Sequence, residues 1–241
     1  MKFTGVALLI SFWLFATTIP PRFPAAPVQA AFPGPNGPIA FTHEAPAGDH
    51  TQTDIYVLPP GKQSARPLTA TPNRNEFGPA YSPDGSRIAY WRTLAPFGPG
   101  SLWLMDADGT HKTQLTHGFD ARDPAWSPDG KRLVFTAASK RGVAFDLWVL
   151  RLKDGRLTRL TGGAPWDFEP AWSPDGKTIA FTRGFEQGDS GDIYIIDIAT
   201  RAMTRVTHHR AYDHQVGWAP DGSRLIFERD SDTTTFIITV R

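Results

Sequence analysis

The sequence of 241 residues contains no cysteine. Disulfide bonds, zinc–thiolate sites and cysteine nucleophiles are therefore excluded. A surplus of charge is also missing, because 25 Lys and Arg stand against 24 Asp and Glu, a formal net charge of +1. Proteins that bind nucleic acid by bulk charge are usually basic, so we expect no nucleic-acid partner. After the first thirty residues no apolar run approaches the roughly 20 residues that a membrane span requires.

Glycine and proline, by contrast, are abundant, with 22 residues of each. Average usage of the two together is roughly 12%, so the chain is rich in turns. Aromatic residues make up 12% and include 8 Trp, a composition that suits strands. Hydrophobic residues make up 40%, which is enough for a packed core and argues against wholesale disorder.

The N-terminus has the pattern of a secretory signal. Lys2 precedes an apolar run from Gly5 to Ile19, and the small-x-small sequence 28–30 follows. We expect residues 1–30 to be a signal peptide cleaved after Ala30, and 31–241 to form the mature domain. The protein is then exported, periplasmic or extracellular, without a membrane span after cleavage. The alternative is an uncleaved N-terminal anchor.

A six-residue motif recurs four times, and its glycines are 45, 46 and 46 residues apart. The four copies share Pro-Asp-Gly at their ends: 80–85, 125–130, 171–176 and 217–222. A degenerate copy with Pro35-Asn36-Gly37 stands at the start of the domain. A period of this length indicates a propeller or a solenoid. We predict five units at 31–76, 77–122, 123–168, 169–213 and 214–241.

Each unit reads as a four-stranded antiparallel meander. In the second unit the apolar runs 88–90 and 102–104 follow the motif, and a third run ends at Leu115-Thr116. Pro-Asp-Gly is turn chemistry, since Pro presets the first turn position and Gly takes a positive φ. Apolar residues at successive strand positions bury both faces of a sheet, as in radially packed blades.

We therefore predict an all-β fold, a β-propeller of about five four-stranded antiparallel blades. The first unit has a poor first strand and the last ends before its fourth. An open stack, or a homo-oligomer that completes a larger ring, are the alternatives.

The repeat resembles that of TolB-type β-propellers over roughly residues 35–241. The resemblance is carried by Pro170–Phe181, Asp192-Ile193-Tyr194 and Arg159-Leu160-Thr161, and by their recurrence at constant spacing. It implies a cell-envelope propeller that binds other proteins through its loops and central channel. It also implies six blades, one more than the repeat count gives.

Acidic residues and one histidine lie three to five positions before the aromatic residue of the motif, in the segments that lead into the innermost strand. We expect them at one mouth of the channel, where converging acids bind a cation, a basic peptide loop or a polyol. The alternative is that each acid caps its own loop by accepting backbone N–H groups. The candidate binding residues are Glu76, Asp123, Asp167, Glu169, Asp213 and His214.

The sequence favours a non-enzymatic protein-binding or scaffold module. Function usually lies in loops, and the variable loops Arg92–Ser101, Ala137–Asp146 and Arg183–Asp192 differ most between units. We expect no catalytic residue and no cofactor, and leave a metal open. The alternative is a carbohydrate-active lyase or hydrolase that uses the channel-mouth acids and His214 for acid–base chemistry.

Overall fold

The computed structural model describes residues 37–47, 50–94, 98–118, 120–138, 144–163, 165–184, 191–230 and 234–240. The predicted signal segment 1–30 lies outside these residues. The described residues form five antiparallel sheets whose neighbouring strands follow chain order. The all-β, five-bladed propeller is therefore confirmed. Within the described residues, no helix is long and apolar enough to cross a membrane.

The blades contain either three or four strands. Blade 1 contains β1 (Ile39–Ala47), β2 (His50–Leu58) and β3 (Arg66–Pro67). Blade 2 contains β4 (Arg74–Tyr81), β5 (Arg87–Leu94), β6 (Ser101–Asp106) and β7 (Thr113–Gln114). Blade 3 contains β8 (Ala121–Trp126), β9 (Arg132–Ala138), β10 (Phe145–Arg151) and β11 (Arg156–Arg159). Blade 4 contains β12 (Trp166–Trp172), β13 (Thr178–Gly184), β14 (Gly191–Asp197) and β15 (Met203–Arg205). Blade 5 contains β16 (Asp213–Trp218), β17 (Arg224–Arg229) and β18 (Thr234–Thr239).

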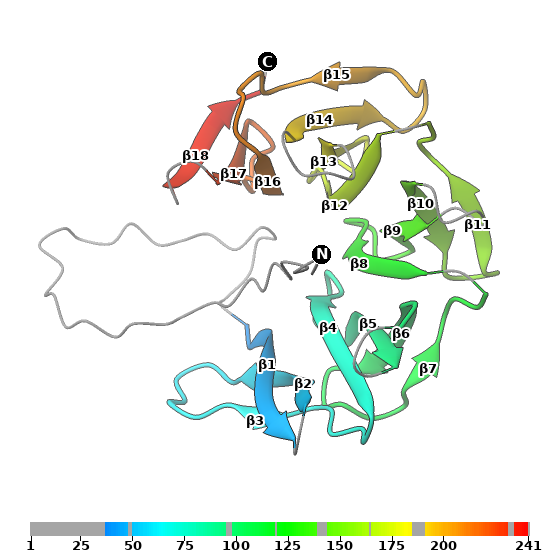
Figure 1. Cartoon of the computed structure of the whole chain (residues 1–241), viewed down its shortest axis with the longest axis vertical. Coiled ribbons are helices and arrows are strands. Elements are labelled where there is room, and N and C mark those ends of the chain that lie inside the picture. The colour runs from blue at the N-terminus through cyan, green and yellow to red at the C-terminus, as the bar shows by residue number, and fades with distance from the viewer. Residues whose placement is uncertain are drawn as a thin grey trace, which may run out of the picture.

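The blades follow one another around an arc (Figure 1). β4, β8, β12 and β16 lie on its inner side and contact one another, while β7, β11 and β15 lie at the rim. Each blade contacts the next, but among the described residues no strand of blade 1 contacts a strand of blade 5. The five blades thus form an arc whose two end sheets are separate.

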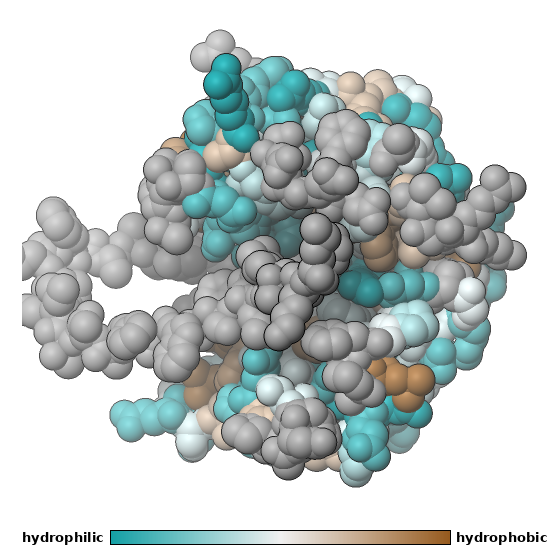
Figure 2. All heavy atoms as spheres, in the orientation of Figure 1, coloured by the Kyte–Doolittle hydropathy of each residue, from teal (hydrophilic) through white to brown (hydrophobic). Residues whose placement is uncertain are grey.

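The core lies between the blades, as the two-faced apolar runs predict. In β5 Ile88, Ala89 and Tyr90 are all fully buried. Ile88 and Tyr90 pack with blade 1, whereas Ala89 packs with Trp126 of blade 3. The faces at the ends of the arc lack such a neighbour, and Ile226 of blade 5 is 43% exposed. The described part of the surface in Figure 2 is mostly hydrophilic, with scattered apolar patches.

The Ser-Pro-Asp-Gly turns are held by their own side chains. In blade 3 the Ser127 hydroxyl donates to Asp129 Oδ1 at 2.5 Å and accepts from the Arg132 N–H at 2.9 Å. The same carboxylate oxygen accepts from the Lys131 N–H at 3.1 Å. Gly130 has φ +65°, a left-handed conformation that glycine adopts without steric cost. The motif therefore specifies the reversal that starts the second strand.

The Leu-Thr or Val-Thr signature has a distinct role. In blades 1 to 4 the buried threonine hydroxyl accepts a buried N–H from the strand that precedes the outermost one, at 2.8 to 2.9 Å. The threonines are Thr69, Thr116, Thr161 and Thr207. A buried N–H without a partner is costly, and the outermost strand is too short to supply every acceptor. The threonine hydroxyl supplies the missing hydrogen-bond acceptor at that point.

Two tryptophans of the motif, Trp126 and Trp218, connect consecutive blades. Trp126 Nε1 donates to the Ala80 carbonyl at 2.9 Å, and Trp218 Nε1 donates to the Ala171 carbonyl at 3.1 Å. Each indole therefore reaches one repeat back along the chain. These bonds link the innermost strands on which the candidate site lies.

Candidate functional site

Each of the four innermost strands, β4, β8, β12 and β16, carries a β-bulge at the candidate site. The strand registers shift after Phe77, Arg122, Phe168 and His214. The next residue in each strand is left-handed, with φ between 50° and 55°: Gly78, Asp123, Glu169 and Gln215. Bulges re-aim side chains next to functional sites, and a non-glycine residue in this conformation is uncommon. Blades 3, 4 and 5 thus hold two acids and an amide at equivalent, strained positions.

Three of the predicted acids lie two positions before the bulge and form buried ion pairs. Arginine Nε lies 2.8 Å from Glu76, 2.7 Å from Asp167 and 2.5 Å from Asp213. All three carboxyl side chains are fully buried. Their partners lie directly opposite on the second strand: Arg92, Arg183 and Arg229. Each of these three carboxylates is therefore paired with an arginine of its own sheet.

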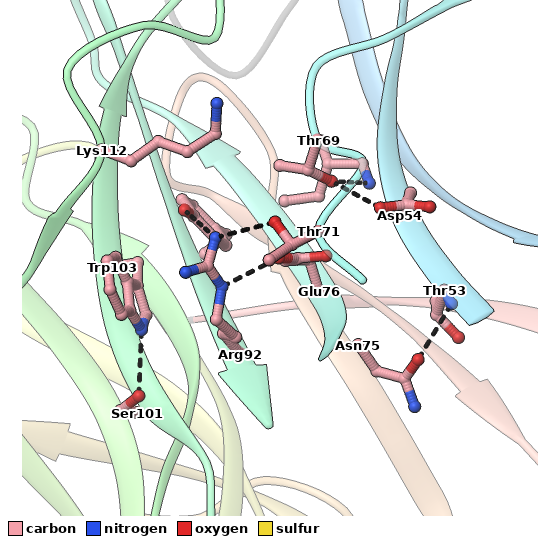
Figure 3. A network of polar contacts seen from close by, with 12 residues as sticks. Thr53, Asp54, Thr69, Thr71, Asn75, Glu76, Arg92, Ser101, Trp103 and Lys112 are labelled. Atoms are coloured by element: carbon pink, nitrogen blue, oxygen red, sulfur yellow. Dashed lines mark hydrogen bonds and ion pairs between the residues drawn. The ribbon is translucent and has the colours of Figure 1, made fainter. Parts of the chain in front are cut away.

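Figure 3 shows the pair in blade 2. Arg92 points towards Glu76 and Thr71 on one side and lies over the ring of Trp103 on the other, 4.1 Å from its centroid. Burial raises the pKa of Glu76, and the adjacent guanidinium opposes that shift. The carboxylate is thus held by a cation that is itself stacked on an aromatic ring.

Blade 3 departs from this pattern. Where blades 2, 4 and 5 pair an acid with an arginine, it has Ala121 opposite Ala137, both fully buried. The fold therefore accepts a small apolar pair at this register. In blade 3 the candidate acid is Asp123, which lies at the bulge itself.

Asp123 and Glu169 are the predicted acids that stay outside these ion pairs. Asp123 is partly buried, and burial together with the nearby Glu169 carboxylate raises its pKa to about 7. Glu169 Oε2 accepts from the Gln215 N–H of blade 5 at 2.7 Å and from the Thr182 hydroxyl at 3.2 Å. Glu169 thus caps a backbone N–H, as the alternative interpretation of the acids predicts, but in the neighbouring blade.

His214 is buried, and its Nε2 lies 2.8 Å from Asp230 Oδ1. Its ring is tilted against Tyr212, with centroids 5.5 Å apart. No group of three or more His, Cys, Asp or Glu is placed to hold a metal ion within the described part of the chain. Much of the three variable loops lies outside that part, so their predicted role stays a prediction.

The sequence interpretation missed the arginine partners. The signal was present, because each arginine follows its acid by 16 residues in blades 2, 4 and 5. A constant separation across a hairpin places two residues opposite one another, and opposite charges at such a register pair.

Residues 119–184 match the family described as the TolB beta propeller domain, PD40. The Tol-Pal system protein TolB of Anaeromyxobacter sp. (strain K) is 50% identical over 44 residues, 18% of this chain and 10% of that protein. The structure of TolB from Acinetobacter baumannii superposes with a TM-score of 0.68 at 22% identity, covering 87% of this chain and 54% of that one. A structure of oligogalacturonate lyase in complex with manganese gives 0.61 at 17% identity, covering 79% and 55%. The chain thus spans about half of these solved structures and a tenth of the curated relative. It is a TolB-like β-propeller that carries PD40 repeats, with partial similarity to TolB.

Proposed function

We propose that the chain is an exported, non-enzymatic protein-binding module that receives a basic side chain of its partner at Asp123 and Glu169. The observation that carries this proposal is the division of the six candidate residues into two groups. Glu76, Asp167 and Asp213 are fully buried and paired with partly buried arginines. The bulge acids are strained and not neutralised by arginine in this way.

Electrostatics support a cationic partner group. Repulsion from Glu169 contributes to the raised pKa of Asp123, and a like charge disfavours ionisation. A lysine or arginine side chain brought between the two carboxylates removes that repulsion and restores the charged form. The cation binds the ionised carboxyl of Asp123, so at low pH this carboxyl must first lose a proton. We therefore expect affinity to rise as the pH rises through about 7.

The test compares partner capture by the immobilised protein and by Asp123→Asn and Glu169→Gln variants, from an envelope extract of the source organism. We expect a specific protein to be captured by the wild type and lost in both variants. Glu44→Gln, which removes an exposed carboxylate on blade 1, is the matched control. Equal capture by all four proteins contradicts the proposal.

An enzyme is the second candidate, because a carboxyl with a pKa near 7 suits general acid–base catalysis. Carbohydrate lyase or hydrolase activity would then depend on Asp123. Turnover of acidic or neutral oligosaccharides by the wild type, abolished by Asp123→Asn, would favour this candidate over the binding module.

A further inference from the structure

A second charged feature lies at the opposite end of the strands from the bulges, where the first and third hairpin turns of each blade meet. A pocket of about 460 Å³ opens there between blades 2 and 3. Five cations and one acid contribute to its lining: Arg87, Lys131, Arg132, Arg151, Lys153 and Asp129. Its size falls in the range of roughly 300–1,000 Å³ typical of ligand sites.

The positive charge departs from the repeat. In blade 2 the first residue of the second strand, Arg87, lies opposite Asp106, and in blade 4 the residue opposite Thr178 is Asp197. In blade 3 Arg132 lies opposite Arg151, which in turn lies opposite Arg156. Like charges directly opposite destabilise a sheet. The fold therefore does not require arginine at the position of Arg151, because blades 2 and 4 have Asp106 and Asp197 there.

The arginines are held in fixed positions. Arg132 lies over Trp172 at 4.7 Å, and Arg87 lies over Trp126 at 5.1 Å. Arg151 binds Asp154 through two bonds, Nε to Oδ1 at 2.9 Å and Nη2 to Oδ2 at 2.6 Å. A guanidinium fork matches a carboxylate in this bidentate geometry. These two bonds fix the guanidinium of Arg151 and leave its Nη1 outside the pair with Asp154.

The two lysines complete the charge. Lys131 and Lys153 are exposed. Among the described residues neither has a carboxylate within 4.0 Å. Asp129 is the acid of the lining. Its Oδ1 accepts from the Ser127 hydroxyl and the Lys131 N–H, and its Oδ2 lies 3.7 Å from Arg132, which leaves Arg87 and the two lysines as cations without such a pair in the lining. A positive surplus therefore remains at the pocket.

We infer that this pocket binds an acidic segment of a protein partner, through at least two carboxylates that engage Arg151 and the lysines. The inference rests on the proposed role as a protein-binding module, and it places a contact of opposite charge on the opposite face from Asp123.

The test uses a short fluorescein-labelled peptide of alternating Glu and Gly, with binding followed by anisotropy at low salt. The variant Arg151→Asp/Lys153→Ala carries the residues that blade 4 has at these positions. We expect at least about tenfold weaker binding, the value of one lost charge-assisted bond. The variant exchanges the exposed Arg151–Asp154 pair for an opposite-charge pair with Arg132. We therefore also expect its thermal stability to stay close to that of the wild type, which separates lost binding from lost folding.

The control variant Lys62→Ala/Arg66→Asp makes the same change in net charge at exposed positions of blade 1. Equal weakening by the control would show bulk attraction and overturn the inference. So would tighter binding of citrate or inorganic pyrophosphate than of the peptide, or no peptide binding by the wild type. If the Arg151→Asp/Lys153→Ala variant still captures the envelope partner in full while Asp123→Asn does not, the pocket is refuted and the proposed function stands.

Discussion

Asp123 combines a strained backbone with a carboxyl that titrates near neutrality. Its φ of 50° is a conformation that costs an L-residue about 1–2 kcal/mol. Gly78 occupies the equivalent position in blade 2, where it avoids that cost. An acid kept where glycine is the stable choice indicates that its side chain has a use, and the raised pKa makes that side chain responsive to pH.

We predict that Asp123→Asn changes how stability depends on pH. The folded pKa of about 7 exceeds the ordinary aspartate value of 3.8, so the folded state retains a proton that the unfolded state releases. Stability therefore falls as pH rises from about 4 to about 7, by at least about 1 kcal/mol. Urea unfolding across this window should show the fall in the wild type and a weaker one in the variant. Parallel curves for the two proteins would contradict the assignment.

The candidate site was predicted only in part at this scale. The rule that acids precede each motif selects the five acids among the candidates, because the repeat places them in register. The sequence did not reveal that the acid five residues before the aromatic points into the sheet, whereas the one three residues before it, such as Glu169, lies at the bulge. A bulge changes the face of every residue on one side of it, and a single inserted residue leaves no compositional trace.

At the scale of the element, side chains accept hydrogen bonds from strand N–H groups that have no backbone acceptor. The Thr161 hydroxyl accepts the buried Leu147 N–H at 2.9 Å. We predict that Thr161→Val, which keeps the shape and removes the acceptor, lowers the free energy of unfolding by about 1–3 kcal/mol. Thr161→Ser should retain most of the stability. Chemical denaturation measures both, and equal losses would assign the effect to packing of the methyl group.

The buried ion pairs give a second prediction. Arg183→Ala leaves Asp167 buried without its guanidinium, which should cost about 3–5 kcal/mol. The double variant Asp167→Ala/Arg183→Ala imitates the Ala121–Ala137 pair of blade 3. We expect the double variant to be more stable than Arg183→Ala alone. A double variant less stable than the single one would show that the carboxylate has other stabilising contacts.

The strands themselves were predictable because three signals agree. Turn chemistry, β-branched and aromatic runs and the constant period all mark the same boundaries, as at Gly130 and the run 133–135 that follows it. The ion pairs and the basic pocket were not predicted, because they depend on which residues face each other across a hairpin. That register is set by the bulge and the turn together.

At the scale of the whole molecule, the arc has interior and terminal blades. Val134 is fully buried against blade 4, whereas Ile226, at the equivalent position of blade 5, is 43% exposed. In a repeat architecture each unit is stabilised by its neighbours. Blades 1 and 5 therefore have one such interface where the others have two.

We predict that hydrogen exchange is fastest in the end blades. Amides of β2 and β17 should exchange faster than those of β9 and β13 under native conditions, because local opening needs less free energy where fewer contacts are broken. Mass spectrometry of peptic fragments measures the difference. Uniform protection across the blades would mean that the two ends are covered by something beyond the described contacts, a second copy of the chain included.

The bonds from Trp126 to Ala80 and from Trp218 to Ala171 all run towards the N-terminus. Blades 3 and 5 thus each donate an indole N–H to a carbonyl of a blade that precedes them in the chain. A chain that leaves a ribosome or a translocation pore from its N-terminal end can therefore add sheets one at a time, each docking on its predecessor. The direction of the indole bonds gives this arc a vectorial order of assembly.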